Sequence, residues 1–337
     1  MTENAKTAGQ IFDRYLPARL PSPRTASVYA PSNIALSKYW GKRDAELNLP
    51  LNSSLSISLG TWGTRTYIAP AQGTIDEVFF NGAVLGLDDP VVRRMLAFVD
   101  LFRRAQIIPL RIETTNSIPT AAGLASSASG FAALALAMNE TFALDLPKST
   151  LSQLARIGSG SAARSLWHGF VRWDRGDDGD GGDCYGHSLD VDWPDFRIAI
   201  ISIHIGPKSS SSRDGMNHTV ATSPLFDPWP AAAEADCAAI EHAIAEKDFV
   251  AVGERAEANA LAMHATMMAA RPSLSYLLPE SWMVLQALWK ARAEGLNCYA
   301  TMDAGPNVKL IFLESQEDDV SRLFPQANVI APFVDQA

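Results

Sequence analysis

The alternation of apolar and polar residues along the chain predicts a protein that mixes strands with helices. Residues 55–59 (Leu-Ser-Ile-Ser-Leu) alternate with a period of two, which is typical of a strand with one buried face. Residues 64–69 are predicted to pair with that strand, and residues 77–80 with the turn at Asn81 and Gly82 predict a hairpin. Further strands are predicted over residues 25–30, ending at Pro31, and over 109–114, 169–173, 298–302 and 308–312.

Helical spacing accounts for much of the remaining chain. Residues 90–105 form an amphipathic pattern, and residues 126–144 predict a helix dense in alanine. Further helices are predicted over residues 11–15, 148–157, 230–246, 248–270 and 281–294. Because helices and strands alternate irregularly, without an internal repeat, we predict an α+β fold built in two layers.

Two boundaries divide the chain in this prediction. Residues 1–24 form an N-terminal arm, because they are polar and interrupted by prolines. A polar segment at 190–194 separates an N-terminal domain, residues 25–194, from a C-terminal domain, residues 195–337. The second domain opens with residues 196–204, an almost continuous apolar run that is typical of a buried strand.

Composition narrows the classes of partner. The formal net charge of −9 argues against a nucleic acid or an anionic membrane as a general partner. The chain has three cysteines without a Cys-x-x-Cys pair, no apolar signal segment, and no apolar run near the roughly 20 residues that span a bilayer. We therefore predict a cytoplasmic protein with reduced thiols that binds neither nucleic acid nor membrane.

The strongest local signal is the run of small residues 119–129 (Pro-Thr-Ala-Ala-Gly-Leu-Ala-Ser-Ser-Ala-Ser), which opens the alanine-rich helix. Small residues let backbone N–H groups approach a polyphosphate, and the helix N-terminus presents unpaired amides to it. Ser126, Ser127 and Ser129 add hydroxyls for phosphate oxygens or Mg²⁺. The run lacks the lysine of GxxxxGK[ST] and the spacing of GxGxxG. We predict that it binds the phosphates of ATP.

A second signal is a cluster of cations and aromatic rings. Lys38, Lys42 and Arg43 stand beside Tyr39 and Trp40 in one short stretch. A solvated basic face is the ordinary explanation of such a cluster. In an acidic protein, however, cations packed among aromatic rings favour a pocket for a highly anionic ligand.

Other polar segments carry candidate chemistry. Asp303 stands in a tight turn, Asp-Ala-Gly-Pro-Asn, between two apolar strands, so its carboxylate is held on a rigid scaffold. Arg164 ends a Gly/Ser-rich segment, and its guanidinium fork suits carboxylates or phosphates. Residues 208–216 are interpreted as a polar loop after the first strand of the second domain. His264 stands among methionines on a predicted helix and is interpreted as a packed structural histidine.

In their order along the chain, these segments resemble the mevalonate diphosphate decarboxylase family of the galactokinase, homoserine kinase, mevalonate kinase and phosphomevalonate kinase (GHMP) superfamily. The resemblance extends over residues 26–313. It implies an N-terminal domain like ribosomal protein S5, a ferredoxin-like C-terminal domain and a deep cleft between them. The matching segments are residues 38–43, 48–54, 119–129, 158–165, 212–216, 222–224, 259–264 and 303–307.

The resemblance implies that ATP, with Mg²⁺, phosphorylates the 3-hydroxyl of mevalonate 5-diphosphate, and that loss of phosphate and CO₂ then gives isopentenyl diphosphate. Asp303 would accept the hydroxyl proton, Lys38 would stabilise the transferring phosphoryl group, and Arg164 would clamp the substrate carboxylate. The implied substrate-binding residues are Tyr39, Lys42, Ser159, Ser161, Ser212 and Arg213. The implied ATP-binding residues are Gly123, Ser126, Ser127 and Ser129, with Ser127 also at Mg²⁺. The family further implies a homodimer.

Three other functions stay open at this point. One is decarboxylation of mevalonate 5-phosphate, because residues 208–212, near the diphosphate end, depart from the commonest family pattern. A second is a GHMP kinase that stops at the phosphorylated product. A third is a nucleotide-binding regulatory protein without catalysis. The presence of Lys38 and Asp303 favours full decarboxylation over phosphorylation alone. Lys42 and Arg213 favour the 5-diphosphate over the 5-phosphate as the substrate.

Overall fold

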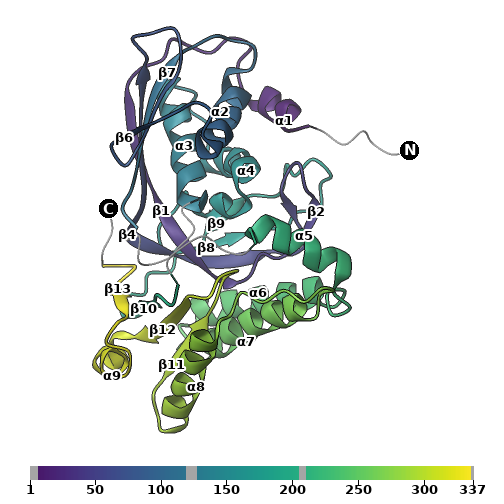
Figure 1. Cartoon of the computed structure of the whole chain (residues 1–337), viewed down its shortest axis with the longest axis vertical. Coiled ribbons are helices and arrows are strands. Elements are labelled where there is room, and N and C mark those ends of the chain that lie inside the picture. The colour runs from purple at the N-terminus through teal and green to yellow at the C-terminus, as the bar shows by residue number, and fades with distance from the viewer. Residues whose placement is uncertain (1–6, 119–126, 205–209, 335–337) are drawn as a thin grey trace.

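The computed structural model describes residues 7–118, 127–204 and 210–334. The predictions for Gly123 and Ser126 lie outside these residues. Figure 1 shows two parts stacked along the long axis, an upper one coloured purple to teal and a lower one coloured green to yellow. Each part combines a sheet with helices, which confirms the predicted two-domain α+β class.

The upper part is built on a mixed sheet that has seven strands in the described residues. The order is β6-β5-β7-β4-β8-β9, with β1 also pairing with β4. The predicted hairpin is confirmed, since Asn81 and Gly82 at its turn have φ angles of 49° and 82°, as a type I′ turn requires. The strands are β1 (Ala26–Ser37), β4 (Ser54–Pro70), β5 (Glu77–Phe80), β6 (Ala83–Leu85), β7 (Leu110–Asn116), β8 (Phe170–Trp173) and β9 (Gly186–Ser188).

One prediction about this sheet is wrong. Residues 55–59 and 64–69 do not pair with each other, because both belong to the single strand β4, which pairs with β1 and β7. β1 likewise continues through Pro31, where its register shifts. A Cβ at Gly63 would lie 2.2 Å from the carbonyl oxygen of Ala30. Glycine therefore permits the close approach of the two strands at the shift, where the pattern had suggested a turn.

Helices lie on one face of this sheet (Figure 1). They are α1 (Ala8–Tyr15), α2 (Pro90–Arg103), α3 (Ser127–Thr141), α4 (Lys148–Gly158) and the short 3₁₀ helix η2 (Gly160–Arg164), while the small ribbon of β2 (Lys42–Asp44) and β3 (Leu49–Pro50) stands beside them. The four α-helices confirm the predicted ones. α3 packs against β1 and β4, because its buried alanines let the backbones approach closely. This packing places the first turn of α3 beside η2.

The lower part contains an antiparallel sheet of order β11-β12-β10-β13. α7 packs against this sheet and against α6, and both helices also contact β1 of the upper part. Within the described ranges, no helix combines the length and the apolar character needed to cross a membrane. The elements are β10 (Phe196–Ile201), α5 (Ser212–Thr222), α6 (Trp229–Ala245), α7 (Phe249–Met268), α8 (Pro279–Ala293), β11 (Cys298–Thr301), β12 (Val308–Leu313), η3 (Glu314–Gln316), α9 (Glu317–Leu323) and β13 (Asn328–Ile330).

The interpretation of residues 208–216 as a loop is wrong from Ser212 onward, where α5 begins. Ser211 is its N-cap: the hydroxyl of Ser211 accepts a hydrogen bond from the backbone N–H of Asp214 at 3.1 Å. A serine run is typical of flexible segments, and here its last member before the helix satisfies an unpaired amide of the first turn. The elements β13 and α9 were not predicted either.

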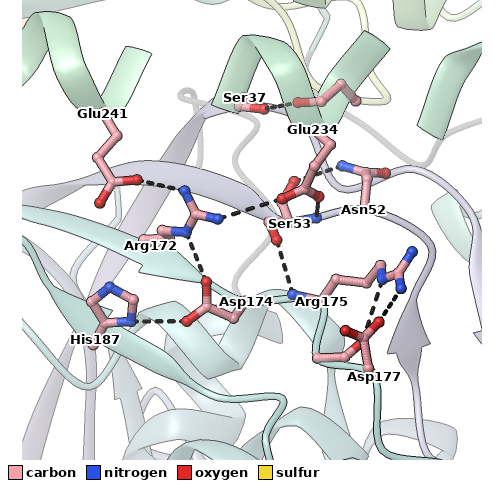
Figure 2. A network of polar contacts seen from close by, with 12 residues as sticks. Ser37, Asn52, Ser53, Arg172, Asp174, Arg175, Asp177, His187, Glu234 and Glu241 are labelled. Carbon is pink, nitrogen blue, oxygen red and sulfur yellow. Dashed lines mark hydrogen bonds and ion pairs between the residues drawn. The ribbon is translucent and has the colours of Figure 1, made fainter. Parts of the chain in front are cut away.

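The two parts meet through an apolar core that runs from the upper sheet into the lower one. A polar network also joins the two parts, and Figure 2 shows its side chains. Arg172 of β8 pairs with Glu241 and Glu234 of α6 at 2.5 and 3.4 Å, and with Asp174 at 2.7 Å. Glu234 also accepts a hydrogen bond of 2.6 Å from the backbone N–H of Ser53. The network therefore ties α6 to the segment between β3 and β4.

Replacing Gly253 with alanine is expected to destabilise the lower part. Gly253 lies on α7, and a Cβ there would lie 2.0 Å from the buried ring of Tyr299 on β11. Since Phe249 and Arg292 also contact that ring, it cannot move away freely. Overpacking of this kind costs about 1–3 kcal/mol, which urea denaturation measures.

Gly130→Ala is the matched control for that experiment. Gly130 also lies inside a helix, α3, but a Cβ there meets nothing within 4 Å. Alanine should therefore raise stability by up to about 1 kcal/mol through helix propensity. Equal stability changes in the two variants would contradict the packing described for Gly253.

Candidate active site

A cavity of about 560 Å³ collects side chains from both parts of the molecule. The end of β1, the start of α3, η2, the start of α5 and the turn after β11 all contribute to its lining. Ten of the residues singled out from the sequence line it: Lys38, Tyr39, Lys42, Ser127, Ser159, Ser161, Arg164, Ser212, Arg213 and Asp303. Segments separated by more than 200 residues thus form one site.

Asp303 projects into this cavity from the turn between β11 and β12. The turn is held by Asn307, whose side-chain oxygen accepts hydrogen bonds from the backbone N–H groups of Ile203 and His204 at 2.8 and 3.0 Å. The Asp303 carboxylate lies between two ammonium groups: Oδ1 is 2.9 Å from Lys38 Nζ, and Oδ2 is 3.1 Å from Lys309 Nζ. Burial would raise the pKa of Asp303, but the two lysines outweigh it and hold the pKa below its usual range.

Lys38 is fixed by contacts from both parts of the molecule. Its backbone N–H donates to the side-chain oxygen of Asn259 on α7 at 2.8 Å, and its carbonyl accepts from Asn52 at 2.8 Å. The ammonium group donates to the carbonyl of Ala35 at 2.7 Å as well as to Asp303. Burial lowers the pKa of Lys38 to about 8, and although Asp303 opposes this shift, other cations reinforce it. Lys38 therefore titrates near physiological pH.

Arg164 is a buried cation at the end of η2. Its guanidinium donates to the hydroxyl of Ser54 at 2.5 Å and to the side-chain oxygen of Asn33 at 3.3 Å. Burial lowers the pKa of Arg164 to about 10, so the group stays charged at neutral pH. Within the described residues it forms no ion pair, and its Nε has no hydrogen-bond partner. A buried cation without a carboxylate partner suits the capture of an anionic ligand.

Three further cations line the cavity close to one another and form a cluster: Lys42, Arg213 and Arg94. Burial lowers the pKa of Lys42 to about 8, with the charges of Arg213 and Arg94 acting in the same direction. Burial and Arg213 lower the pKa of Arg94 too. Cations that lie this close together are stabilised by a ligand of high negative charge. Sequence reasoning missed Arg94, because its place on an amphipathic helix looks like an ordinary solvated position.

The hydroxyl-bearing residues divide into two groups. Ser127, in the first turn of α3, lies 3.4 Å from Ser159 Oγ, which is 3.5 Å from Ser161 Oγ, and all three line the cavity. Ser129 does not line the cavity: its side chain is fully buried, and its Oγ lies 2.8 Å from Thr64 Oγ1. This hydroxyl joins α3 to β4, and ATP binding by Ser129 stays a prediction.

Tyr39 and His264 complete the surroundings. The Tyr39 ring packs edge-on against Trp173, and a Cβ at Gly160 would lie 2.7 Å from it, so glycine permits η2 to approach the ring. Burial raises the pKa of Tyr39, which therefore stays protonated. Burial and Lys38 lower the pKa of His264 to about 4, so this histidine is neutral and does not line the cavity. This placement agrees with the interpretation of His264 as a packed structural histidine.

Lys309 is the second site residue that sequence reasoning missed. It lies on β12 in the sequence Val-Lys-Leu-Ile-Phe-Leu, which is otherwise apolar. A strand buried on both faces cannot hold an unpaired ammonium group, so a lone lysine in such a strand indicates a buried acidic partner. Here the partner is Asp303.

Comparison with known proteins agrees with this geometry. Residues 30–186 match the diphosphomevalonate decarboxylase-like N-terminal domain, and residues 198–335 match the mevalonate 5-diphosphate decarboxylase C-terminal domain. A diphosphomevalonate decarboxylase of Aspergillus fumigatus is 38% identical over 319 residues, which cover 88% of this chain and 78% of that protein. The diphosphomevalonate decarboxylase of Homo sapiens is 34% identical over 306 residues, covering 85% and 76%.

Solved structures share the fold. The crystal structure of mevalonate diphosphate decarboxylase from Staphylococcus aureus matches with a TM-score of 0.85 and 36% identity, covering 91% of this chain and 95% of that one. The structure described as MDDEF in complex with MVAPP, AMPPCP and magnesium has a TM-score of 0.84 and 36% identity, with coverages of 91% and 96%. The fold is that of the GHMP kinase superfamily. By sequence and by structure, the chain belongs to the diphosphomevalonate decarboxylase family.

Proposed function

We propose that this protein converts mevalonate 5-diphosphate to isopentenyl diphosphate, using ATP and releasing ADP, phosphate and CO₂. One observation carries the proposal: a single cavity is lined by a carboxylate held between lysines, by a buried arginine that has no carboxylate partner among the described residues, and by a cluster of three further cations. These groups match the hydroxyl, the carboxylate and the diphosphate of that substrate. The relatives named above are diphosphomevalonate decarboxylases, which supports the same assignment.

In this proposal each polar group of the substrate meets a matching group of the cavity. The diphosphate binds at the three-cation cluster, the C1 carboxylate at the Arg164 fork, and the 3-hydroxyl at Asp303. Asp303 orients this hydroxyl and accepts its proton while the hydroxyl oxygen bonds to the γ-phosphorus and ADP leaves. Lys38 stabilises the charge on the transferring group. Next the C3–O bond to phosphate breaks, and the electrons of the C1–C2 bond form the C2–C3 double bond as CO₂ departs.

Ser127 is the described residue best placed to hold Mg²⁺ and a nucleotide phosphate, because it opens α3 and faces the cavity. The described residues contain no group of three or more His, Cys, Asp or Glu side chains arranged for a metal ion. That fits Mg²⁺, which takes most of its ligands from phosphate oxygens and water. When bound, Mg²⁺ neutralises charge on the transferred phosphoryl group. Gly123 and Ser126 belong to the same proposal by resemblance.

Several features separate this function from its rivals. A cluster of three cations exceeds what a monophosphate needs, which favours the 5-diphosphate. A kinase that stops after phosphorylation does not need the Arg164 clamp on the carboxylate. An assay of ADP release with mevalonate, its 5-phosphate and its 5-diphosphate tests the proposal. We expect rapid ADP formation only with the diphosphate. ATP binding without turnover on any of the three would support a regulatory protein instead.

The KM for mevalonate 5-diphosphate is expected to rise between about pH 7 and about pH 9, because Lys42 loses its charge as the pH passes about 8. Below that pH, Lys42 is protonated and attracts the diphosphate; above it, one cation of the cluster is neutral. Steady-state kinetics across this range measure the effect. Lys42→Arg is the matched variant: arginine stays charged, so its KM should change much less. An equal rise in both enzymes would contradict this role for Lys42.

The oligomeric state and the cellular location of the enzyme remain predictions. We propose a homodimer, on the resemblance alone, and analytical ultracentrifugation tests it. We also propose a cytoplasmic location, which three buried free cysteines support.

A further inference from the structure

The Asp303 carboxylate is held at both of its oxygens. Lys38 contacts Oδ1 at 2.9 Å, and Lys309 contacts Oδ2 at 3.1 Å. One ion pair restrains a carboxylate but leaves it free to rotate about its terminal bond. Two ion pairs, one for each oxygen, fix the plane of the group. The Asp303 side chain is 39% exposed, toward the cavity, while the side chains of the two lysines are 2% and 4% exposed.

The two lysines stand on different kinds of support. Lys309 lies within β12, an interior strand of the lower sheet, where its backbone is opposite Ile200 of β10 and Thr301 of β11. Lys38 follows the last residue of β1 in the upper part, and its ammonium group also donates to Ala35. An ammonium group has three donors, so Lys38 can contact Asp303 and a phosphoryl oxygen together. Lys309 is the rigid member of the pair.

We propose that Lys309 is a positioning residue, which fixes the plane of the Asp303 carboxylate so that the oxygen shared with Lys38 meets the substrate hydroxyl. The inference rests on the proposed function. The inference gives the two lysines different tasks. Lys38 stabilises the charge of the transferring phosphoryl group, and Lys309 holds the Asp303 carboxylate in place during the transfer. Misplacement of a reacting group by about 1 Å can cost about a hundredfold in rate, so a loosened carboxylate affects kcat more than KM.

The contacts of Lys38 and Lys309 with Asp303 also affect the pKa of Lys38, which can be measured without turnover. Four charged or titratable groups lie around these atoms: Lys38 just after β1, Lys309 from β12, Arg164 from η2 and His264 from α7. Lys309 helps to lower the pKa of Lys38, and it competes with Lys38 for Asp303. Removing Lys309 therefore raises the pKa of Lys38 on both counts. His264 stays neutral, with its pKa near 4, and does not mask the change.

Limited acetylation with acetic anhydride at a series of pH values, followed by mass spectrometry of the peptide that contains Lys38, measures this pKa without substrate. We expect a midpoint of about 8 in the wild-type protein and a midpoint about one unit higher in Lys309→Met. Lys309→Arg keeps the charge and should keep the wild-type midpoint. Lys290→Met, at an exposed position on α8, controls for the loss of a lysine elsewhere.

Kinetics of the same variants complete the test. Lys309→Met should lower kcat at least about tenfold with KM within about threefold, and Lys309→Arg should recover most of the loss. Lys309→Met should fold, because Asp303 keeps Lys38 as its partner; thermal unfolding checks this.

An unchanged Lys38 midpoint in Lys309→Met would overturn the inference, as would a raised KM with an unchanged kcat, which would make Lys309 a substrate contact. A wild-type enzyme that releases no CO₂ would instead overturn the proposed function. Acetylation would still decide in that case whether the two lysines share the carboxylate.

Discussion

Replacing Asp303 with asparagine is expected to lower kcat by about 10²- to 10⁴-fold, the range over which general base catalysis contributes, with the KM nearly unchanged. The amide has the size of the carboxylate but cannot accept the proton of the 3-hydroxyl. Replacing Asp303 with alanine should abolish turnover. The alanine variant would also leave Lys38 and Lys309 without their carboxylate partner, and unpaired buried charges destabilise a fold strongly. Asparagine is therefore the sharper variant.

Steady-state ADP release measures kcat for Asp303→Asn, and calorimetric titration with mevalonate 5-diphosphate measures binding. The control is Asp319→Asn, which removes an exposed carboxylate from α9, where it pairs with an exposed arginine, Arg322. That variant should behave like the wild type. If Asp303→Asn kept more than about a tenth of the wild-type kcat, Asp303 would not be the proton acceptor.

Replacing Arg164 with alanine is expected to weaken substrate binding and to lower kcat. Loss of a hydrogen bond to a charged group costs about 1.5–3 kcal/mol, which corresponds to a rise in KM of about 10- to 150-fold. The fall in kcat follows because the carboxylate that leaves as CO₂ is no longer held in line. Arg164→Lys keeps the positive charge but lacks the planar guanidinium group. Its KM should therefore lie closer to the wild-type value than its kcat does.

The matched control for Arg164→Ala is Arg197→Ala. Arg197 is also a buried arginine, but it lies on β10, pairs with Glu314 and Glu317 at 2.5 and 3.0 Å, and does not line the cavity. Its loss should lower the unfolding temperature and leave the KM at the wild-type value. An Arg164→Ala enzyme with wild-type KM would contradict the carboxylate clamp.

Much of the fold could be predicted because its periodicity is local. The amphipathic spacing of α2 and the Asn81-Gly82 turn depend on neighbouring residues, so the pattern alone indicates them. The course of β4 could not be predicted in this way. Gly60 and Gly63 resemble turn signals, and only the pairing of the residues on both sides of Gly60 with β1 shows that the chain continues as one strand. α5 was missed because a serine run gives no apolar stripe.

The candidate site could be predicted where its residues stand in distinctive segments. Lys38, Arg164 and Asp303 fall in such segments, and all three line one cavity. Lys309 and Arg94 do not. Arg94 lies on an amphipathic helix like an ordinary solvated residue, and the lone lysine of β12 indicates an acidic partner without identifying it. Their significance depends on contacts across the fold: Lys309 with Asp303 through the β11–β12 turn, and Arg94 with the cations near η2. Such contacts appear only once the tertiary structure is known.

The central claim is that this cavity both phosphorylates and decarboxylates one substrate. The most direct test follows ¹⁴CO₂ from mevalonate 5-diphosphate labelled at C1, incubated with the enzyme, ATP and Mg²⁺, while ADP is measured in the same samples. The account predicts that CO₂ and ADP form in equal amounts, and that both form at least about a hundredfold more slowly with Asp303→Asn. ADP formation without labelled CO₂ would contradict it and would identify the protein as a kinase that stops at the phosphorylated product.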